Sequence, residues 1–172
     1  MLFRSGLGLN LYRNKLKGNF LIFAAGTGIV PVFDLICLTL RYVAYKISRE
    51  KYGINDNLLL LGEDKFFNEN IAQDYCLSLY LTYKNLSSSI ALDFLKEFQE
   101  INKIYKLNIF KLYLRFSNED KWDENFLIEK IEGSTAVIEK VYIIGPSGFC
   151  RDLREGLKCH KVHINQENII IV

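Results

Sequence analysis

The sequence predicts an α/β fold built on a five-stranded, doubly wound parallel sheet. Two strand-length segments, the apolar residues 20–23 and residues 140–144, which are apolar after Lys140, each end in a glycine-containing turn that leads into a helical segment. Helical and strand patterns alternate between them. Unbroken apolar runs are typical of strands covered on both faces, as parallel strands are. The 172 residues, 49% of them hydrophobic and 24% charged, suffice for one domain with a sizeable core.

The first strand, residues 20–23, is followed by a Gly-Thr-Gly turn. Gly26 and Gly28 can adopt backbone angles that other residues avoid and let an anion approach the main chain, while Thr27 adds a hydroxyl group. Pro31 suits the first position of a helix, whose free N–H groups would face the turn. The turn is therefore a candidate phosphate site, although such turns also occur simply to pack a helix closely on a sheet.

A helix is predicted after this turn, with an acidic residue in its first turn and Gly53 suited to end it. Residues 55–74 combine a short apolar run with polar and acidic residues. We interpret them as an insertion, either a short strand or a loop, before the next core strand. The apolar stripe of the helix consists of Phe33, Ile36, Leu40, Val43 and Ile47.

The alternation of helix and strand continues to the end of the chain. Serines at 87–89 offer N-caps for a helix that reaches Tyr105 with one apolar face. In residues 110–116 large apolar residues alternate with polar ones, which predicts an outer strand with one wetter face. Right-handed helical crossovers then join parallel strands. The remaining predicted elements are a short helix at 124–132, a strand at 140–144 and a helix at 150–158.

A second turn, Gly145-Pro146-Ser147-Gly148, ends the strand at 140–144. In an open parallel sheet, ligands bind at the carboxyl ends of the strands where the strand order reverses, so two such turns favour a dinucleotide site. Together, Gly26-Thr27-Gly28-Ile29-Val30-Pro31 and Ile144-Gly145-Pro146-Ser147-Gly148-Phe149 resemble motifs of the ferredoxin reductase and cytochrome b5 reductase superfamily. The nicotinamide-dinucleotide domain of that family carries Gly-Thr-Gly-Ile-x-Pro early and Cys-Gly-Pro-x-x-Met late.

The resemblance covers nearly the whole chain and implies the strand order 3-2-1-4-5. It makes residues 79–84 the second strand and residues 163–172 the closing strand. In the family a flavin-binding β-barrel with an Arg-x-Tyr-Ser/Thr segment precedes this domain, and that segment is not found before Asn19. Residues 1–18 accordingly resemble the stretch that leaves the barrel, and residues 19–172 resemble the NAD(P)H-binding domain.

The resemblance also implies a site for NADH or NADPH, with FAD held by a partner or missing domain. Thr27 and Ile144 would lie nearest the reacting ring, but the family has cysteine where Ile144 stands. Isoleucine offers no polarizable sulfur there, so hydride transfer would be slowed. Lys84 would favour a 2′-phosphate, whereas the turns resemble those of NADH enzymes, so both cofactors stay open. The implied dinucleotide contacts are Gly26, Thr27, Gly28, Ile29, Pro31, Thr82, Lys84, Gly145, Pro146 and Phe149.

Composition argues against several other functions. A net charge of +2 with interspersed signs gives no strong field for polyanions, so nucleic acid is not an expected partner. The apolar stretch Phe20–Leu40 is interrupted by two glycines, a proline and an aspartate, so we expect no transmembrane segment. Four cysteines and two histidines lack the spacing of zinc or iron–sulfur sites, and no metal is expected. A basic N-terminus leaves cytoplasmic and mitochondrial locations open.

Two functions therefore stay open. The chain is either the NAD(P)H-binding half of a flavin-dependent reductase, with a possible downstream electron acceptor protein, or a non-catalytic scaffold or accessory subunit that keeps the fold. Hydride transfer needs no protein nucleophile, because the cofactors make and break the bonds while the protein orients them. The lack of a Ser-His-Asp set is thus compatible with the first function, and the flavin motif is the feature that distinguishes the two.

Overall fold

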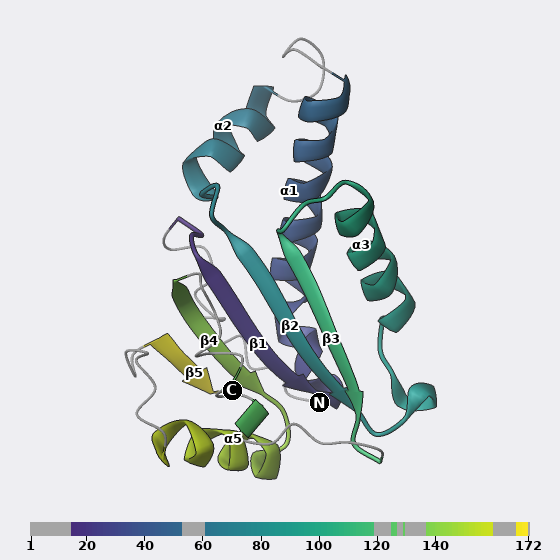
Figure 1. Cartoon of the computed structure of the whole chain (residues 1–172), viewed down its shortest axis with the longest axis vertical. Coiled ribbons are helices and arrows are strands. Elements are labelled where there is room, and N and C mark those ends of the chain that lie inside the picture. Colours follow the sequence, from purple (N-terminus) through teal and green to yellow (C-terminus); the bar gives the residue numbers. More distant parts are fainter. Residues whose placement is uncertain are drawn as a thin grey trace, which may run out of the picture.

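A computed structural model describes residues 15–52, 61–118, 125, 126, 129, 137–159 and 168–171. A five-stranded sheet lies at its centre, with every neighbouring pair of strands parallel and the order β3-β2-β1-β4-β5 (Figure 1). The predicted fold class and strand order are confirmed. The strands are β1 Asn19–Ala25, β2 Cys76–Tyr83, β3 Phe110–Phe116, β4 Ile138–Ile144 and β5 Ile169–Ile171.

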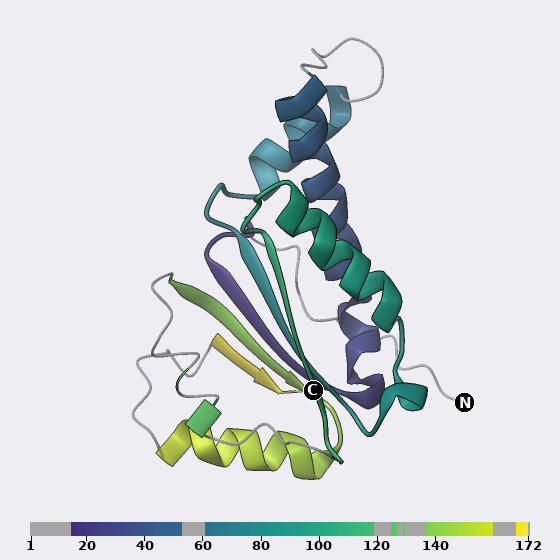
Figure 2. The same ribbon diagram turned by 45° about the vertical axis from the view of Figure 1, so that its right-hand side comes forward.

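Helices cover both faces of this sheet. Figure 2 shows α1 and α3 on one face and α5 on the other. Every residue of β1 and β2 is buried, as continuous apolar strands in a parallel sheet require. Successive side chains point to opposite faces, so Phe20 and Ile22 join the larger core, while Leu21 and Phe23 join a smaller core under α5. The helices are α1 Phe33–Tyr52, α2 Leu61–Asn70, α3 Leu92–Ile104 and α5 Ser147–Cys159, with 3₁₀ helices η1 Gly26–Val32 and η2 Leu86–Ser88.

The interpretation of residues 55–74 as a short strand or loop was wrong for residues 61–70, whereas residues 71–74 are not helical. Residues 61–70 form α2, although the helix has little amphipathic pattern. Its Phe67 is 1% exposed and packs against the rings of Tyr42 and Tyr45 in α1, with centroids 5.6 and 5.0 Å apart. Contacts with another helix, rather than local periodicity, therefore account for this element.

The chain becomes helical earlier than Pro31, where the sequence placed the first helical position. The 3₁₀ helix η1 begins at Gly26, immediately after β1, and Pro31 lies inside it. The α-helix α1 then continues from Phe33, with Asp34 in its first turn. The Gly-Thr-Gly segment is therefore the first turn of a helical run and not an open loop, because 3₁₀ geometry commonly forms the first turns of α-helices.

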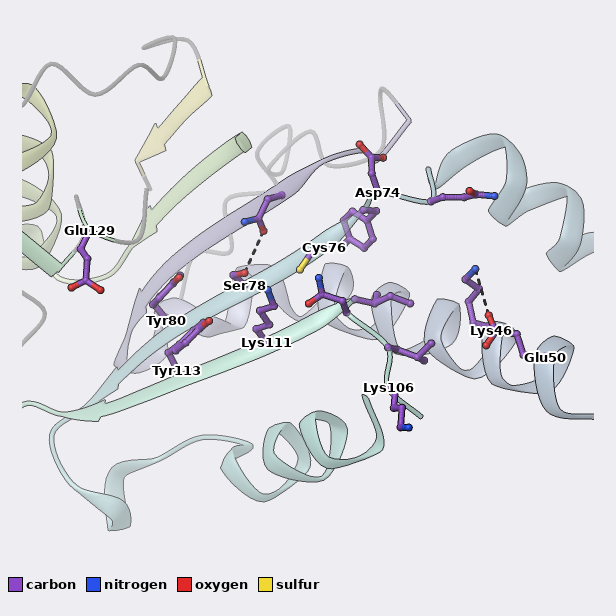
Figure 3. A pocket seen from close by; sticks show the side chains of 16 residues that line it. Lys46, Glu50, Asp74, Cys76, Ser78, Tyr80, Lys106, Lys111, Tyr113 and Glu129 are labelled. Atoms are coloured by element: carbon purple, nitrogen blue, oxygen red, sulfur yellow. Dashed lines mark hydrogen bonds and ion pairs between the residues drawn. The ribbon is translucent and has the colours of Figure 1, made fainter. Parts of the chain in front are cut away.

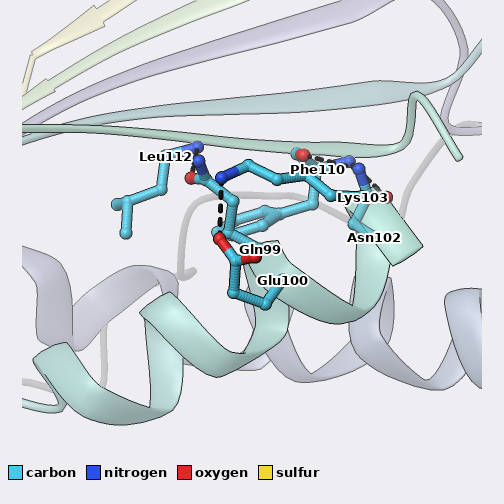
Figure 4. A network of polar contacts seen from close by, with 6 residues as sticks. All are labelled: Gln99, Glu100, Asn102, Lys103, Phe110 and Leu112. Carbon is cyan, nitrogen blue, oxygen red and sulfur yellow. Dashed lines mark hydrogen bonds and ion pairs between the residues drawn. The ribbon is translucent and has the colours of Figure 1, made fainter. Parts of the chain in front are cut away.

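Two amides of α3 bind the edge strand β3 (Figure 4). The Asn102 side chain accepts hydrogen bonds from the N–H groups of Ile109 and Phe110, and its Nδ2 donates to the carbonyls of Leu107 and Phe110. The N–H of Leu112 donates to Gln99 Oε1 at 2.8 Å. These bonds fix α3 on β3 and satisfy backbone groups that an edge strand otherwise exposes.

Several predicted segments lie wholly or partly outside the described residues. Of the short helix at 124–132, residues 125, 126 and 129 are helical. The closing strand is described as β5, and residues 1–14 of the expected barrel-exit segment and Gly53 fall outside. Gly26–Glu50 is long and apolar enough to cross a membrane by length and composition, but half of the relevant window is buried within the fold. That burial is typical of the core helix of a sheet-based domain.

Candidate nucleotide site

A cavity of about 410 Å³ lies at the carboxyl edge of the sheet. It is formed by the last residues of β1 and β2, the residue after β3, and the first two turns of α5. Strand order reverses beside β1, so this is the place where doubly wound sheets bind ligands. The lining residues are Ala25, Gly26, Thr82, Tyr83, Lys84, Ser117, Pro146, Phe149, Asp152 and Leu153.

One wall of the cavity is polar and carries an unsatisfied group. Thr82, at the end of β2, is 9% exposed, and its Oγ1 is buried without a hydrogen-bond partner among the described residues. Buried side-chain hydroxyls in folded proteins are nearly always hydrogen-bonded, so this oxygen requires an explanation. Next to it, Lys84 is exposed and brings an ammonium group to the rim. The wall can therefore offer both a hydroxyl and a positive charge to a ligand.

The opposite wall is largely apolar and is held in shape by Cys150. Its half-buried Phe149 and exposed Pro146 line the cavity at the start of α5. The Cys150 thiol donates to the Gly145 carbonyl at 3.4 Å, and the Cys150 N–H donates to the Pro146 carbonyl at 3.0 Å. Burial raises the pKa of the Cys150 thiol, which favours the protonated form that donates to the Gly145 carbonyl.

The glycines of the two turns have different structural roles. Gly26 has a φ of +56°, and a Cβ there would meet no atom within 4 Å, so it leaves space at the cavity. Gly28 is buried, and a Cβ there would overlap the carbonyl oxygen of Ile144. A Cβ on Gly145 would lie 3.0 Å from both Ala25 and Phe149. Gly28 and Gly145 therefore let η1, β4 and α5 pack closely, which is the simple packing role left open above.

The structure brings together five of the predicted site residues and separates the others. Gly26, Thr82, Lys84, Pro146 and Phe149 line the cavity. By contrast, six others lie outside its lining. Thr27 and Pro31 are exposed on η1, Gly28 is buried against the Ile144 carbonyl, Gly145 is half-buried behind Phe149, and Ile29 and Ile144 belong to the larger core.

Ile144 is 3% exposed, so its side chain offers little surface to a ring. Sequence reasoning missed four lining residues. Two signals were available for them: Ser117 directly follows a strand, and Asp152 and Leu153 lie one helical turn beyond Phe149. The missed residues are Ala25, Ser117, Asp152 and Leu153.

Metal chemistry has no visible basis in the part of the chain that the structure describes. Within it, no three residues among His, Cys, Asp and Glu are grouped closely enough to hold an ion. Burial raises the pKa of the Cys76 thiol, with the Lys111 charge opposing that shift. The polar groups that the candidate nucleotide site offers a ligand are the Thr82 hydroxyl, the Lys84 ammonium and the Asp152 carboxylate.

Comparison with solved structures identifies the fold. A mutant of ferredoxin-NADP+ reductase from Plasmodium falciparum in complex with 2′P-AMP is similar over 90% of this chain, at 17% identity and a TM-score of 0.55. The chain has the ferredoxin reductase-like nucleotide-binding fold. Flavohemoglobin from Malassezia yamatoensis with bound FAD and heme matches over 94% of the chain, at 16% identity and a TM-score of 0.52.

The cytochrome b5 reductase domain of Ulva prolifera nitrate reductase matches over 91% of the chain, at 13% identity and a TM-score of 0.50. This chain spans only part of each solved structure: 52% of the ferredoxin-NADP+ reductase, 33% of the flavohemoglobin and 49% of the cytochrome b5 reductase domain. No family model and no curated protein matches the sequence. The likeness thus lies in the fold.

Proposed function

We propose that the chain is the NAD(P)H-binding half of a flavin-dependent reductase and that it passes a hydride to FAD held by another domain or subunit. The observation that carries this proposal is the cavity at the carboxyl edge, with the partnerless Thr82 hydroxyl in its wall. Support also comes from the fold, which is shared with a ferredoxin-NADP+ reductase that holds 2′P-AMP.

The lining residues fit a nucleotide in their chemistry. Rotation about the Cα–Cβ bond of Thr82 would turn its hydroxyl toward the cavity, where it could donate to a ligand oxygen. The Lys84 ammonium would neutralise a phosphate, and the Asp152 carboxylate would accept hydrogen bonds from ribose hydroxyls. Phe149 and Pro146 would exclude water from the apolar side of the ligand. These four contributions are binding and orientation, the work that proteins do for hydride-transfer cofactors.

NAD(P)H would supply the hydride, and FAD would accept it. This chain's task in that step is to hold the nicotinamide end toward the partner and to keep it dry. Thr27, exposed at the start of η1, remains the predicted residue nearest the ring. FAD, its partner domain and a downstream electron acceptor are all part of the proposal.

A second candidate is a scaffold or accessory subunit that binds the dinucleotide without catalysing hydride transfer. Ile144 favours it, because an isoleucine in the core stands where the family resemblance places a cysteine beside the reacting ring. A protein with that substitution could keep its affinity and lose rate, since a group that acts on the reacting geometry alters kcat more than ground-state binding.

Calorimetry of the full chain with NADH and with NADPH tests the binding. We expect saturable binding, with Lys84→Met weakening NADPH more than NADH if that ammonium meets the 2′-phosphate. Lys96→Met, an exposed lysine on α3, is the matched control and should change neither affinity. An absorbance scan should show no bound flavin. Binding of neither dinucleotide at millimolar concentration would contradict the reductase proposal.

Stopped-flow flavin reduction separates the two candidates once a flavin domain is supplied. If Ile144 limits the reaction, Ile144→Cys should raise the reduction rate with little change in dinucleotide affinity. Equal rates in the two variants, with chemistry as the slow step, would show that Ile144 does not limit hydride transfer. Binding without any flavin reduction in either variant would favour the accessory subunit.

A further inference from the structure

A second recess is separated from the candidate nucleotide site by a row of aromatic side chains on the sheet. It has a volume of about 600 Å³ and shares no lining residue with the first cavity. Three stacked rings cross the sheet at its border: Phe23 on Tyr80 at 4.6 Å and Tyr80 on Tyr113 at 4.5 Å between centroids. The recess begins at these rings and runs toward the amino ends of β1, β2 and β3, where Lys46 and Glu50 of α1 also line it (Figure 3). We call it the Lys111 recess.

Polar side chains occupy the floor of the Lys111 recess, where central parallel strands normally place apolar ones. Asn19 of β1 is 8% exposed and Ser78 of β2 is 3% exposed. Ser78 Oγ donates to Asn19 Oδ1 at 3.3 Å, so the two residues form one polar unit across the strands. With its oxygen engaged, the Asn19 amide still has two N–H groups to donate.

Lys111 brings a positive charge to the same floor. It stands opposite Ser78 in the β2–β3 register, is half-buried, and pairs with no acidic residue among the described ones. Its charge acts inside the recess, because it opposes the rise in the pKa of the Cys76 thiol that burial causes. A partly desolvated ammonium without a counter-ion is unfavourable, so an anion is the ligand that this floor would stabilise.

Tyrosine hydroxyls complete the donor set. In Figure 3 the side chains of Ser78, Tyr80, Lys111 and Tyr113 project from β2 and β3 on one side of the sheet. Tyr80 and Tyr113 are hydrogen-bonded to each other, and burial raises the pKa of Tyr80 well above its usual value, so its hydroxyl stays protonated. The recess therefore presents hydroxyl, amide and ammonium donors together, a set that suits an oxyanion.

We propose that the Lys111 recess is a second binding site, for a small molecule that carries a carboxylate or phosphate group held by Lys111 and the Asn19 amide. The rim carries Glu50, which pairs with Lys46 at 3.8 Å, and also Asp74, Glu129 and Lys106, so it adds no net positive charge to that of Lys111. Such a rim does not attract extended polyanions, so the ligand is a small molecule with one oxyanion group. This site does not depend on the proposed dinucleotide function.

The test is an NMR titration of the full chain at pH 7 with inorganic phosphate and, separately, with acetate. We expect saturable shifts of the Asn19 side-chain amide and of the Ser78 and Lys111 backbone amides with at least one of the two anions. Shifts with both anions indicate recognition of the oxyanion alone, and shifts with one identify the preferred group. Signals of Gly26 and Lys84 report binding at the nucleotide cavity separately.

Two variants and one control make the test decisive. Lys111→Met keeps the aliphatic stem but removes the charge, so it should abolish the shifts. Asn19→Asp keeps the oxygen that accepts from Ser78 but replaces the amide donors with a negative charge, so it should weaken binding at least roughly tenfold. Lys96→Met, on α3 and remote from the recess, should bind as the wild type does. Absence of saturable shifts at millimolar anion overturns the proposal, and so does equal binding by the Lys111→Met variant in its folded state.

Discussion

Replacing Thr82 with valine should stabilise the free protein and weaken nucleotide binding at the same time. The Thr82 hydroxyl is buried without a partner in the described part of the chain. An unsatisfied buried hydroxyl costs about 1–3 kcal/mol, and valine has nearly the same shape without the hydroxyl. The β-branched side chain also keeps its preference for the strand. Removal of the group should therefore raise the free energy of unfolding.

The size of the effect follows from the same penalty. For a domain of this size, 1 kcal/mol corresponds to about 2–4 °C in Tm, so Thr82→Val should raise Tm by about 2–12 °C. If the hydroxyl donates to bound NAD(P)H, the lost hydrogen bond should weaken affinity by about two- to tenfold. Thermal unfolding followed by circular dichroism, and calorimetric titration with the dinucleotide, measure the two quantities.

Thr39→Val is the matched control. Thr39 is fully buried in α1, where its hydroxyl donates to the Leu35 carbonyl at 2.7 Å and shares a hydrogen bond of 2.8 Å with Tyr75. The same substitution there removes satisfied bonds and should lower stability by about 1–3 kcal/mol. A fall in Tm for Thr82→Val comparable with that of Thr39→Val would refute the reasoning, because it would mean that the Thr82 hydroxyl is already bonded in the free protein.

Three further predictions concern packing, the edge strand and pH. Gly28→Ala should lower the free energy of unfolding by about 1–3 kcal/mol or more, because its Cβ would overlap the Ile144 carbonyl. Gly148→Ala is the control: its Cβ would meet open space in α5, so it should raise the free energy of unfolding by about 0.5–1 kcal/mol. Urea denaturation measures both. Asn102→Leu should lower the free energy of unfolding by about 3–5 kcal/mol, because it leaves buried backbone groups of β3 unpaired. Lys103→Ala, which removes an exposed ion pair at 2.7 Å, should change the same quantity by less than about 0.5 kcal/mol. Burial raises the pKa of Tyr142 to about 12, so the folded state holds this proton above the ordinary tyrosine pKa of 10.0. Stability should therefore fall between those pH values by about 2–3 kcal/mol more in the wild type than in Tyr142→Phe, in which the other buried tyrosines still titrate.

The sheet was predictable because its strands depend on local pattern. Residues 110–116 were predicted with the observed bounds, since strict alternation marks a strand with two unlike faces. Helix α2 was not predictable in this way, because only Phe67 among its described side chains is buried, and its partners lie in α1, more than twenty residues earlier in the chain. A helix held by one aromatic contact set leaves little periodicity in its own sequence.

The candidate site was predictable in place and only partly in detail. The rule that ligands bind at the carboxyl ends of parallel strands indicated the turn with Gly26, and the family resemblance added Thr82 and Lys84; all three line the cavity. The packing role of Gly28 depends on how close η1 lies to the carbonyl of Ile144, which no local pattern encodes. Sequence also described Lys111 only as part of a wetter strand face, because the polar pair that adjoins it comes from two other strands.

The amides of Gln99 and Asn102 also bear on how this protein behaves among copies of itself. Open sheet edges are the sites at which strands of different molecules pair, in domain swapping and in fibrils. The first half of β3 has its outward N–H groups, at Phe110 and Leu112, already bonded to α3. An incoming strand would have to break these bonds before it could pair there. The helix thus protects its own strand from intermolecular recruitment, in addition to the charged Lys111 and Arg115 of β3.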